Sequence, residues 1–330
     1  MNKGNYTAEK KAFRICVVSF PAPSTLVVNV LLYNLVEILE SICERVYVVT
    51  SNIPKDKNFS EKIRIKDVKT ALHFRDTIHP RWWSTLLQFF KIIFIQMKMC
   101  WMLTKISKEV DMVIFYVGGD SLFPPVLMAK VLRKKVITAA IGLGSLGYRK
   151  AHNKRLFSMG GAISTIHNIF ERANFYLSDR IIVESPGVID FLGLDKYRQK
   201  LAVSGVYIDT NFFQIKKVLR GRKNLVGYVG RLSFEKGVMN FVKAMPLILE
   251  KSNNIEFLIG GGGTPQSKIM DELRKNNLSQ NVKQTGWIPH NEVVDYFNEL
   301  KLFILPSYSE GLPHTVLKVM ACGTPVLATP

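Results

Sequence analysis

Residues 302–330 read LFILPSYSEGLPHTVLKVMACGTPVLATP, and this stretch decides the fold. The apolar run Leu302–Leu305 predicts a strand, and the prolines, serines and glycine after it mark a turn. His314–Cys322 has the residue spacing of a helix, and Pro325–Ala328 is a second short apolar run. A strand, a helix and another strand in this order predict two parallel strands covered by a helix.

The same alternation runs back through the whole chain, and then restarts. In the second half we expect strands at Leu225–Val229, Glu256–Ile259 and Val282–Thr285, with helices at Val238–Lys251, Ser267–Asn276 and Glu292–Leu300. In the first half we expect helices at Leu26–Cys43 and Leu122–Leu132, and strands at Phe13–Ser19, Arg45–Thr50, Ile63–Val68, Val110–Val117, Lys135–Ile141, Arg180–Glu184 and Lys200–Val203. Two α/β domains are therefore predicted, residues 1–215 and 216–330, with the boundary at the basic stretch Lys216–Lys223.

Composition favours a protein of a reducing compartment. The four cysteines are scattered and form no CxxC pair, which argues against a zinc site or a disulfide framework. The first residues, MNKGNYTAEKKAF, are polar and lack the apolar region of a signal peptide. We expect a cytoplasmic location.

The formal net charge of +19 predicts an anionic partner. Three partners could explain that charge: nucleic acid, an anionic membrane surface or phosphorylated small molecules. The alternative is a basic surface that is simply solvated. The sequence contains no zinc finger, no RNP aromatic pattern and no KH-type loop, so we expect no nucleic acid. A membrane surface together with phosphate ligands is the favoured interpretation.

One predicted helix, Trp82–Ile106, is overwhelmingly apolar. Lys91, Lys98 and Lys105 are seven residues apart and therefore fall on one stripe of it. Three interior lysines make a membrane span costly. A helix that lies in the membrane interface fits better, and a core helix of the first domain remains the alternative.

A GxGxxG pattern occurs at Gly142–Gly147 and raises the hypothesis of a dinucleotide-dependent dehydrogenase. The residues around this pattern do not fit a dinucleotide-binding motif. Such a motif opens a helix after the first strand and is followed by an acidic residue about 20 positions later. Here YRKAHNKR follows, and the nearest acidic residue, Glu171, lies in a helical pattern.

A stronger candidate site is spread over the second half. In GYVGRLSFEKG, residues 227–237, Arg231 and Lys236 follow a strand that ends near Gly230. Glycine lets the backbone approach a ligand, and the carboxyl ends of strands are where α/β folds bind phosphates. Glu310 stands in the turn after Leu302–Leu305 and could accept hydrogen bonds from sugar hydroxyls.

This ordered set resembles the retaining glycosyltransferases of family 4, which have the GT-B fold. The matching segments are GRLSFEKG, FLIGGGG, GWIPHNEVVDYF and LFILPSYSEGLPHTVLKVMACGTPVLATP, which together cover nearly the whole second domain. The first domain resembles the family more weakly, through ERANFYLSDRIIVES and KLAVSGVYIDTNFF. The resemblance implies two Rossmann-like domains whose parallel sheets face a cleft, with the donor nucleotide held by the second.

The resemblance also implies residue roles. Arg231, Lys236 and Glu310 would be the catalytic residues, the first two on the donor diphosphate and the third on the donor sugar. Further donor-binding positions would be Gly230, Gly262, Trp287, Ile288, Gly311, Leu312 and Lys318, with the base near Trp287 and Ile288. The acceptor would lie near Ser24, Thr25, Arg149 and Lys150. No metal or other cofactor is expected, since this fold usually needs none and the sequence has no Asp-x-Asp.

Three positions depart from the family pattern. Lys318 stands where the family has the second Glu of Glu-x7-Glu, and a lysine has no acceptor for the ribose hydroxyls. Ile141 stands where many members have a histidine. The chain ends at Pro330, before the family's last elements, so an incomplete second domain is expected.

The sequence thus predicts a retaining, metal-independent transferase that moves a hexosyl unit from a nucleoside diphosphate sugar to an acceptor hydroxyl. A lipid-linked saccharide or polysaccharide precursor is the expected acceptor. An anionic membrane surface is the expected partner, with the protein peripheral to the inner face of the membrane. The alternative is a truncated, inactive homologue that binds a sugar or a partner without turnover, and the dehydrogenase is a third hypothesis.

Overall fold

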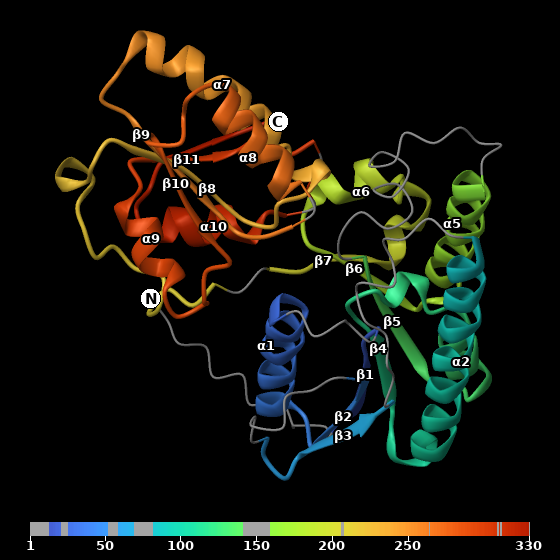
Figure 1. Ribbon diagram of the computed structural model, residues 1–330. Helices are drawn as coiled ribbons and strands as arrows, with labels where there is room; N and C mark the ends of the chain where they lie inside the picture. Colours follow the sequence, from blue (N-terminus) through green and yellow to red (C-terminus); the bar gives the residue numbers. More distant parts are fainter. Residues whose placement is uncertain are drawn as a thin grey trace. The chain divides into compact units, whose positions relative to one another are not determined.

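The computed structural model describes residues 13–20, 26–51, 59–68, 82–140, 159–205, 208–263, 265–308, 310 and 312–329. The chain divides into two compact units, residues 1–205 and 206–330, each built around a parallel sheet (Figure 1). The second unit begins before the basic stretch Lys216–Lys223, and Lys216 itself bonds to Asn298 and Asp295 within that unit.

The sheet of the first unit has seven parallel strands in the order β3-β2-β1-β4-β5-β6-β7. These strands are β1 Arg14–Val18, β2 Arg45–Thr50, β3 Ile63–Asp67, β4 Met112–Phe115, β5 Lys135–Ala140, β6 Arg180–Val183 and β7 Leu201–Val203. The helices are α1 Leu26–Ile42, α2 Trp82–Ile106, α3 Phe123–Val131, α5 Met159–Leu177 and α6 Pro186–Leu192. All seven strands predicted from the sequence are confirmed, whereas α5 and α6 were not among the predicted helices.

Both faces of this sheet are covered, as the alternation along β1 shows. Ile15 and Val17 pack in the cluster that contains Leu32 and Val36 of α1. Cys16 and Val18 point to the other face, into the cluster formed by α2 and α3. Successive strand residues point to opposite faces, so an apolar strand of this kind needs helices on both sides. The helix predicted at Trp82–Ile106 thus forms with those bounds and packs one side against the sheet.

The sheet of the second unit has five parallel strands in the order β10-β9-β8-β11-β12. They are β8 Leu225–Val229, β9 Glu256–Gly260, β10 Val282–Gly286, β11 Leu302–Leu305 and β12 Val326–Ala328. The helices are α7 Val238–Lys251, α8 Gln266–Lys275, α9 Val293–Glu299 and α10 His314–Ala321. The chain builds outward from β8 in one direction and then returns to its other side with β11, so the sheet has a topological switch point between these strands.

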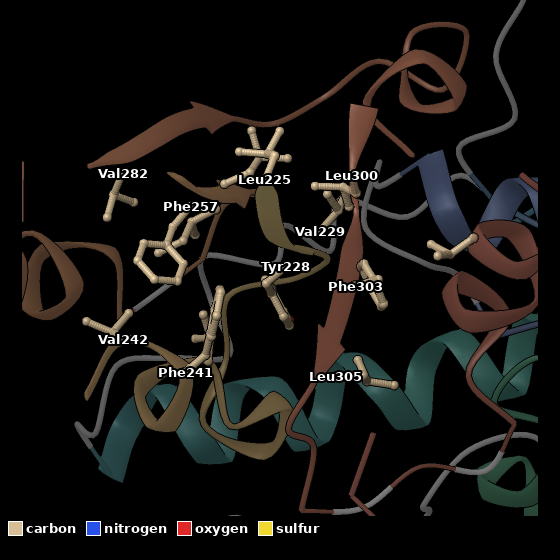
Figure 2. Packing of buried hydrophobic residues seen from close by; sticks show 14 of the residues in the cluster. Leu225, Tyr228, Val229, Phe241, Val242, Phe257, Val282, Leu300, Phe303 and Leu305 are labelled. Atoms are coloured by element: carbon tan, nitrogen blue, oxygen red, sulfur yellow. The ribbon is translucent and has the colours of Figure 1, made fainter. Parts of the chain in front are cut away.

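Aromatic side chains fill the core of this unit (Figure 2). Phe241 of α7 meets Phe257 of β9 edge to face with 5.9 Å between the ring centroids, and Tyr228 of β8 is fully buried beside them. Large apolar side chains contribute most of the stabilising burial, so these rings fix how α7 lies on the sheet. The loop that joins β8 to α7 is held in place as a result.

Arg222 is a buried cation near the start of the second unit, and its guanidinium joins three segments. It donates to the carbonyls of Lys217, Leu300 and Cys322 at 2.7–2.9 Å, and also to Thr324. Leu300 and Cys322 follow the last residues of α9 and α10, where carbonyl groups have no partner within the helix. Burial lowers the pKa of Arg222, and the carbonyls replace the water that it has lost.

We predict that Arg222→Met destabilises the second unit by about 3 kcal/mol, because methionine fills the space but leaves several buried carbonyls without a donor. Urea unfolding of the full chain, followed by circular dichroism, should show the transition at lower urea. The exposed neighbour Arg220→Met is the control and should leave the transition unchanged. Equal midpoints for Arg222→Met and wild type would contradict the role given to this residue.

Candidate functional site

The candidate residues gather at the carboxyl edge of the second sheet, on both sides of the switch point. Arg231 and Lys236 follow β8, and Glu310 follows β11, the strand that pairs with β8. Parallel strands end at the same edge, so residues far apart in the sequence meet there. In open α/β sheets this edge is the usual place for a ligand.

The loops after β8 and β11 touch through a glycine. Gly237 has φ +63°, and a Cβ built on it would lie 1.8 Å from the carbonyl oxygen of Pro306. No other residue type fits at this approach without moving the backbone. The amide of Tyr308 donates to the carbonyl of Glu235 at 2.8 Å, and the rings of Phe234 and Tyr308 stack at 5.4 Å. The two loops therefore pack together as one layer of backbone at the edge of the sheet.

The glycine-rich end of β9 packs against the same layer. Gly230 donates to the carbonyl of Gly260 at 3.0 Å, and Leu232 donates to that of Gly262 at 2.9 Å. A Cβ on Gly261 (φ +124°) would lie 1.9 Å from the carbonyl oxygen of Gly230, so a side chain here would separate the two loops. Gly262 faces open space, with no heavy atom within 4 Å of its Cβ position. It is thus the position of this run where a ligand has room to approach.

The centre of the site is an ion pair between Lys236 and Glu310. The Lys236 ammonium lies 2.6 and 2.7 Å from the two carboxylate oxygens, and each side chain is about a quarter exposed or less, at 24% and 20%. Ser307, which is 5% exposed, donates its hydroxyl to the same carboxylate at 2.6 Å. Three groups from two loops thus hold a cation and an anion side by side at the switch point.

Arg231 forms a second pair, with Glu235, at 2.8 Å. Burial raises the pKa of Glu235, but hydrogen bonds to the carboxylate and the charges of Arg231 and Lys236 outweigh it, and the pKa lies below its usual value. Glu235 is therefore ionised at neutral pH and orients the guanidinium. Arg231 keeps 59% of its side chain exposed, so it remains available to a ligand.

The turn after β10 brings two more candidates to this edge. Ile288 packs against the end of β9, since its Cδ1 would lie 2.6 Å from a Cβ built on Gly260. Trp287 is 58% exposed. An exposed aromatic ring beside the strand ends offers a surface for stacking a base.

Lys318 on α10 lies over an aromatic ring, and no carboxylate of the described residues pairs with it. Its ammonium is 5.0 Å from the ring centroid of Phe213, and His290 stacks on Phe212 at 5.3 Å. Burial lowers the pKa of Lys318, and burial followed by the charge of Lys318 lowers the pKa of His290. Two basic groups are thus held close together at this point of the second unit.

Some predicted positions cannot be compared. Ser24, Thr25, Arg149, Lys150 and Gly311 lie outside the described residues, as do Ile141 and the Gly142–Gly147 pattern. Leu312 is half-buried, two residues before α10. Within the described part of the chain, no group of three or more His, Cys, Asp or Glu residues could hold a metal ion.

Sequence reasoning missed two side chains that contact the candidate residues, Ser307 and Glu235. Ser307 stands three residues before Glu310, a spacing at which a hydroxyl reaches a carboxylate in a turn. Glu235 stands four residues after Arg231, a spacing typical of local ion pairs. Both signals are present in the sequence, but each is too common in proteins to point to a site.

The second unit, which contains the candidate site, is similar in sequence to known glycosyltransferases. Residues 209–330 match the sequence model described as Glycosyl transferases group 1. The 2-deoxystreptamine N-acetyl-D-glucosaminyltransferase of Niallia circulans is 28% identical over 116 residues, which are 35% of this chain and 30% of that protein. The amylovoran biosynthesis glycosyltransferase AmsK of Erwinia amylovora is 24% identical over 260 residues, 69% of this chain and 63% of that protein. The chain therefore spans less than two thirds of the length of either relative.

Solved structures match the chain over nearly its whole length. Sucrose-phosphate synthase from Thermosynechococcus elongatus superposes with a TM-score of 0.73 at 20% identity, covering 96% of this chain and 81% of that one. Anabaena HepE, solved in complex with UDP, superposes with a TM-score of 0.64 at 13% identity, covering 96% and 80%. At these identities the likeness establishes the fold. The chain has the GT-B fold of glycosyltransferases, with two parallel sheets in two α/β units, and its second unit matches the Glycosyl transferases group 1 family.

Proposed function

We propose that the chain is a hexosyltransferase of the family 4 type, which moves a sugar from a nucleoside diphosphate to an acceptor hydroxyl with retention at the anomeric carbon. The observation that carries the proposal is the Lys236–Glu310 pair at the switch point, with Arg231 on the same loop as Lys236. The pair combines a cation for phosphate with an acceptor for hydroxyls. A nucleoside diphosphate sugar offers both groups within one molecule.

The two cations act on the leaving group. As the bond between the anomeric carbon and the diphosphate breaks, negative charge grows on the phosphate oxygens. Lys236 and Arg231 are fixed by Glu310 and Glu235, so they stabilise that charge with little reorganisation. The matching fold of HepE, solved in complex with UDP, supports a nucleoside diphosphate as the ligand.

Glu310 orients the sugar. Its carboxylate accepts hydrogen bonds and lies half-enclosed beside Ser307, so it can hold sugar hydroxyls while the anomeric carbon gains positive charge. The acceptor oxygen then bonds to the anomeric carbon, and the departing phosphate takes the acceptor proton. This route requires no protein nucleophile and no metal ion, and it preserves the anomeric configuration.

The remaining positions complete the proposed donor site. Gly230, Gly262, Gly311 and Leu312 would present backbone to the sugar and phosphates, and Trp287 with Ile288 would hold the base. Ser24, Thr25, Arg149 and Lys150 are proposed for the acceptor side. For the acceptor we propose a lipid-linked saccharide or polysaccharide precursor at the inner face of a membrane, an idea supported by the similarity to a glycosyltransferase of amylovoran biosynthesis.

The first test is Lys236→Ala. We expect UDP binding to weaken about 10- to 100-fold, the range for one charge-assisted hydrogen bond. Calorimetry with UDP, ADP and GDP measures it and also identifies the base. Lys243→Ala, an exposed lysine on α7, changes the net charge equally and should bind like the wild type. Unchanged affinity in Lys236→Ala, with native circular dichroism, would remove this residue from the phosphate site.

The second test is Glu310→Gln, which releases Lys236 from its counter-ion. We expect the bare nucleoside diphosphate to bind more tightly than it does to the wild type, by about threefold to tenfold, while transfer from its sugar is lost. Calorimetry and a diphosphate-release assay measure the two effects separately. If affinity for the diphosphate falls together with activity, Glu310 supports the phosphate site rather than the sugar.

The third test concerns Lys318, which stands where the family pattern has a glutamate. Lys318→Glu restores an acceptor for ribose hydroxyls, so we expect about tenfold tighter binding of nucleotide sugars, roughly 1.4 kcal/mol. Lys318→Met removes the charge without adding an acceptor and should change affinity little. If Lys318→Glu instead slows a wild type that turns over quickly, the lysine itself takes part in the reaction.

A further inference from the structure

Helix α2 has two apolar faces, one buried in the first unit and one exposed to solvent among the described residues. Ile95, Met99 and Leu103 are each at most 2% exposed and pack in the core of the first unit. On the opposite side lies an outer stripe, which consists of Phe90, Phe94, Met97 and Trp101, each 57–64% exposed. The spacing of four, three and four residues places these side chains in one line along the helix.

A lysine row borders the outer stripe on one side. Lys91, Lys98 and Lys105 follow one another at seven-residue intervals, about two helical turns apart. The Lys98 ammonium lies 4.7 Å from the ring centroid of Phe94, and the Lys105 ammonium lies 3.7 Å from that of Trp101. Within the described residues, none of the three lysines pairs with a carboxylate. The row therefore carries charge that no carboxylate of the described residues neutralises.

The neighbouring helix α3 also carries exposed apolar side chains. α3 packs beside α2 in the same layer, with Val126 and Ala129 in the core. Its exposed apolar side chains are Leu127 and Val131, at 42% and 68%. Exposed apolar side chains in line along a helix and bordered by charge are typical of a docking surface.

The chemistry of the surface selects its occupant. Among the described residues, no helix is long and apolar enough to cross a membrane. A second copy of the chain would bring a like-charged lysine row and another formal charge of +19 to the contact. An anionic phospholipid surface instead offers acyl chains to the aromatic side chains and phosphates to the lysines.

We propose that α2 docks this protein on anionic phospholipid bilayers, with the outer stripe at the acyl boundary and the lysine row at the headgroup phosphates. Long lysine side chains allow this arrangement, because their methylene stems lie along apolar surface while the ammonium reaches outward. The inference deepens the proposed function, because it names the surface through which the enzyme would meet a membrane-borne acceptor. Lipid binding can nevertheless be measured without any donor or acceptor.

The test is flotation of the full chain with vesicles of phosphatidylcholine alone, or with about a third phosphatidylglycerol. We expect binding only to the anionic vesicles at low salt, and release when the ionic strength is raised. The double variant Phe94→Ala and Trp101→Ala should lower the partition coefficient at least tenfold. The triple variant of Lys91, Lys98 and Lys105 to Gln should lower it by about fivefold per lysine.

Matched controls keep the result specific to α2. The exposed pair Ile38→Ala and Ile42→Ala on α1 also removes two exposed apolar side chains, and the Gln triple of Lys243, Lys251 and Lys268 removes the same charge from the second unit. Both controls should bind like the wild type. All variants should keep the wild-type affinity for UDP, so that a defect in lipid binding is separated from a failure of the donor site.

Three results would overturn the proposal. The first is that the wild-type protein does not bind anionic vesicles at low salt. The second is an equal loss of binding in the α2 variants and their controls, which would mean that net charge alone brings the protein to the lipid. The third is a wild-type dimer in sedimentation that Phe94→Ala and Trp101→Ala dissociate, because the stripe would then be occupied by a second copy.

Discussion

The backbone at Gly237 lies against the carbonyl of Pro306, and the arrangement of the candidate site depends on this contact. A Cβ in that position would be 1.8 Å from the oxygen, so the loop after β8 and the loop after β11 are held together by the absence of a side chain. Lys236 precedes the glycine directly, and Glu310 follows the proline by four residues. The ion pair at the switch point is therefore a result of close backbone packing, rather than a contact that the two charges had to create across solvent.

Much of this unit could be predicted from the sequence, because its elements are short, apolar and separated by glycine and proline. The bounds of β8, α7 and β11 agree with the predicted ranges Leu225–Val229, Val238–Lys251 and Leu302–Leu305. The pairing of Lys236 with Glu310 could not be predicted from the sequence. The two residues are 74 positions apart, and each was assigned to a different part of a ligand. Local patterns specify strands and helices, whereas contacts between loops depend on the strand order, which local patterns do not contain.

The orientation of helix α2 likewise could not be predicted from its sequence alone. The apolar periodicity predicted its bounds, but with apolar residues on both sides it could not say which side faces the core. The sheet and α3 decide that, by covering Ile95, Met99 and Leu103 and leaving Phe94 and Trp101 outside. The interfacial helix and the core helix, which the sequence posed as alternatives, describe two sides of one element. The core side is confirmed by the packing, and the lipid side remains a prediction.

The Lys236–Glu310 pair also has a consequence for selectivity. Without a ligand, each charge already has a partner in the other, together with the Ser307 hydroxyl. An anion such as inorganic phosphate can replace Glu310 beside the lysine, but the carboxylate then loses its cationic partner and retains the Ser307 hydroxyl as a donor in a largely buried position, which is unfavourable. A molecule that carries both phosphates and hydroxyl groups replaces both partners at once. Under the proposed function, the pair would therefore favour ligands that combine the two chemistries over small anions such as inorganic phosphate.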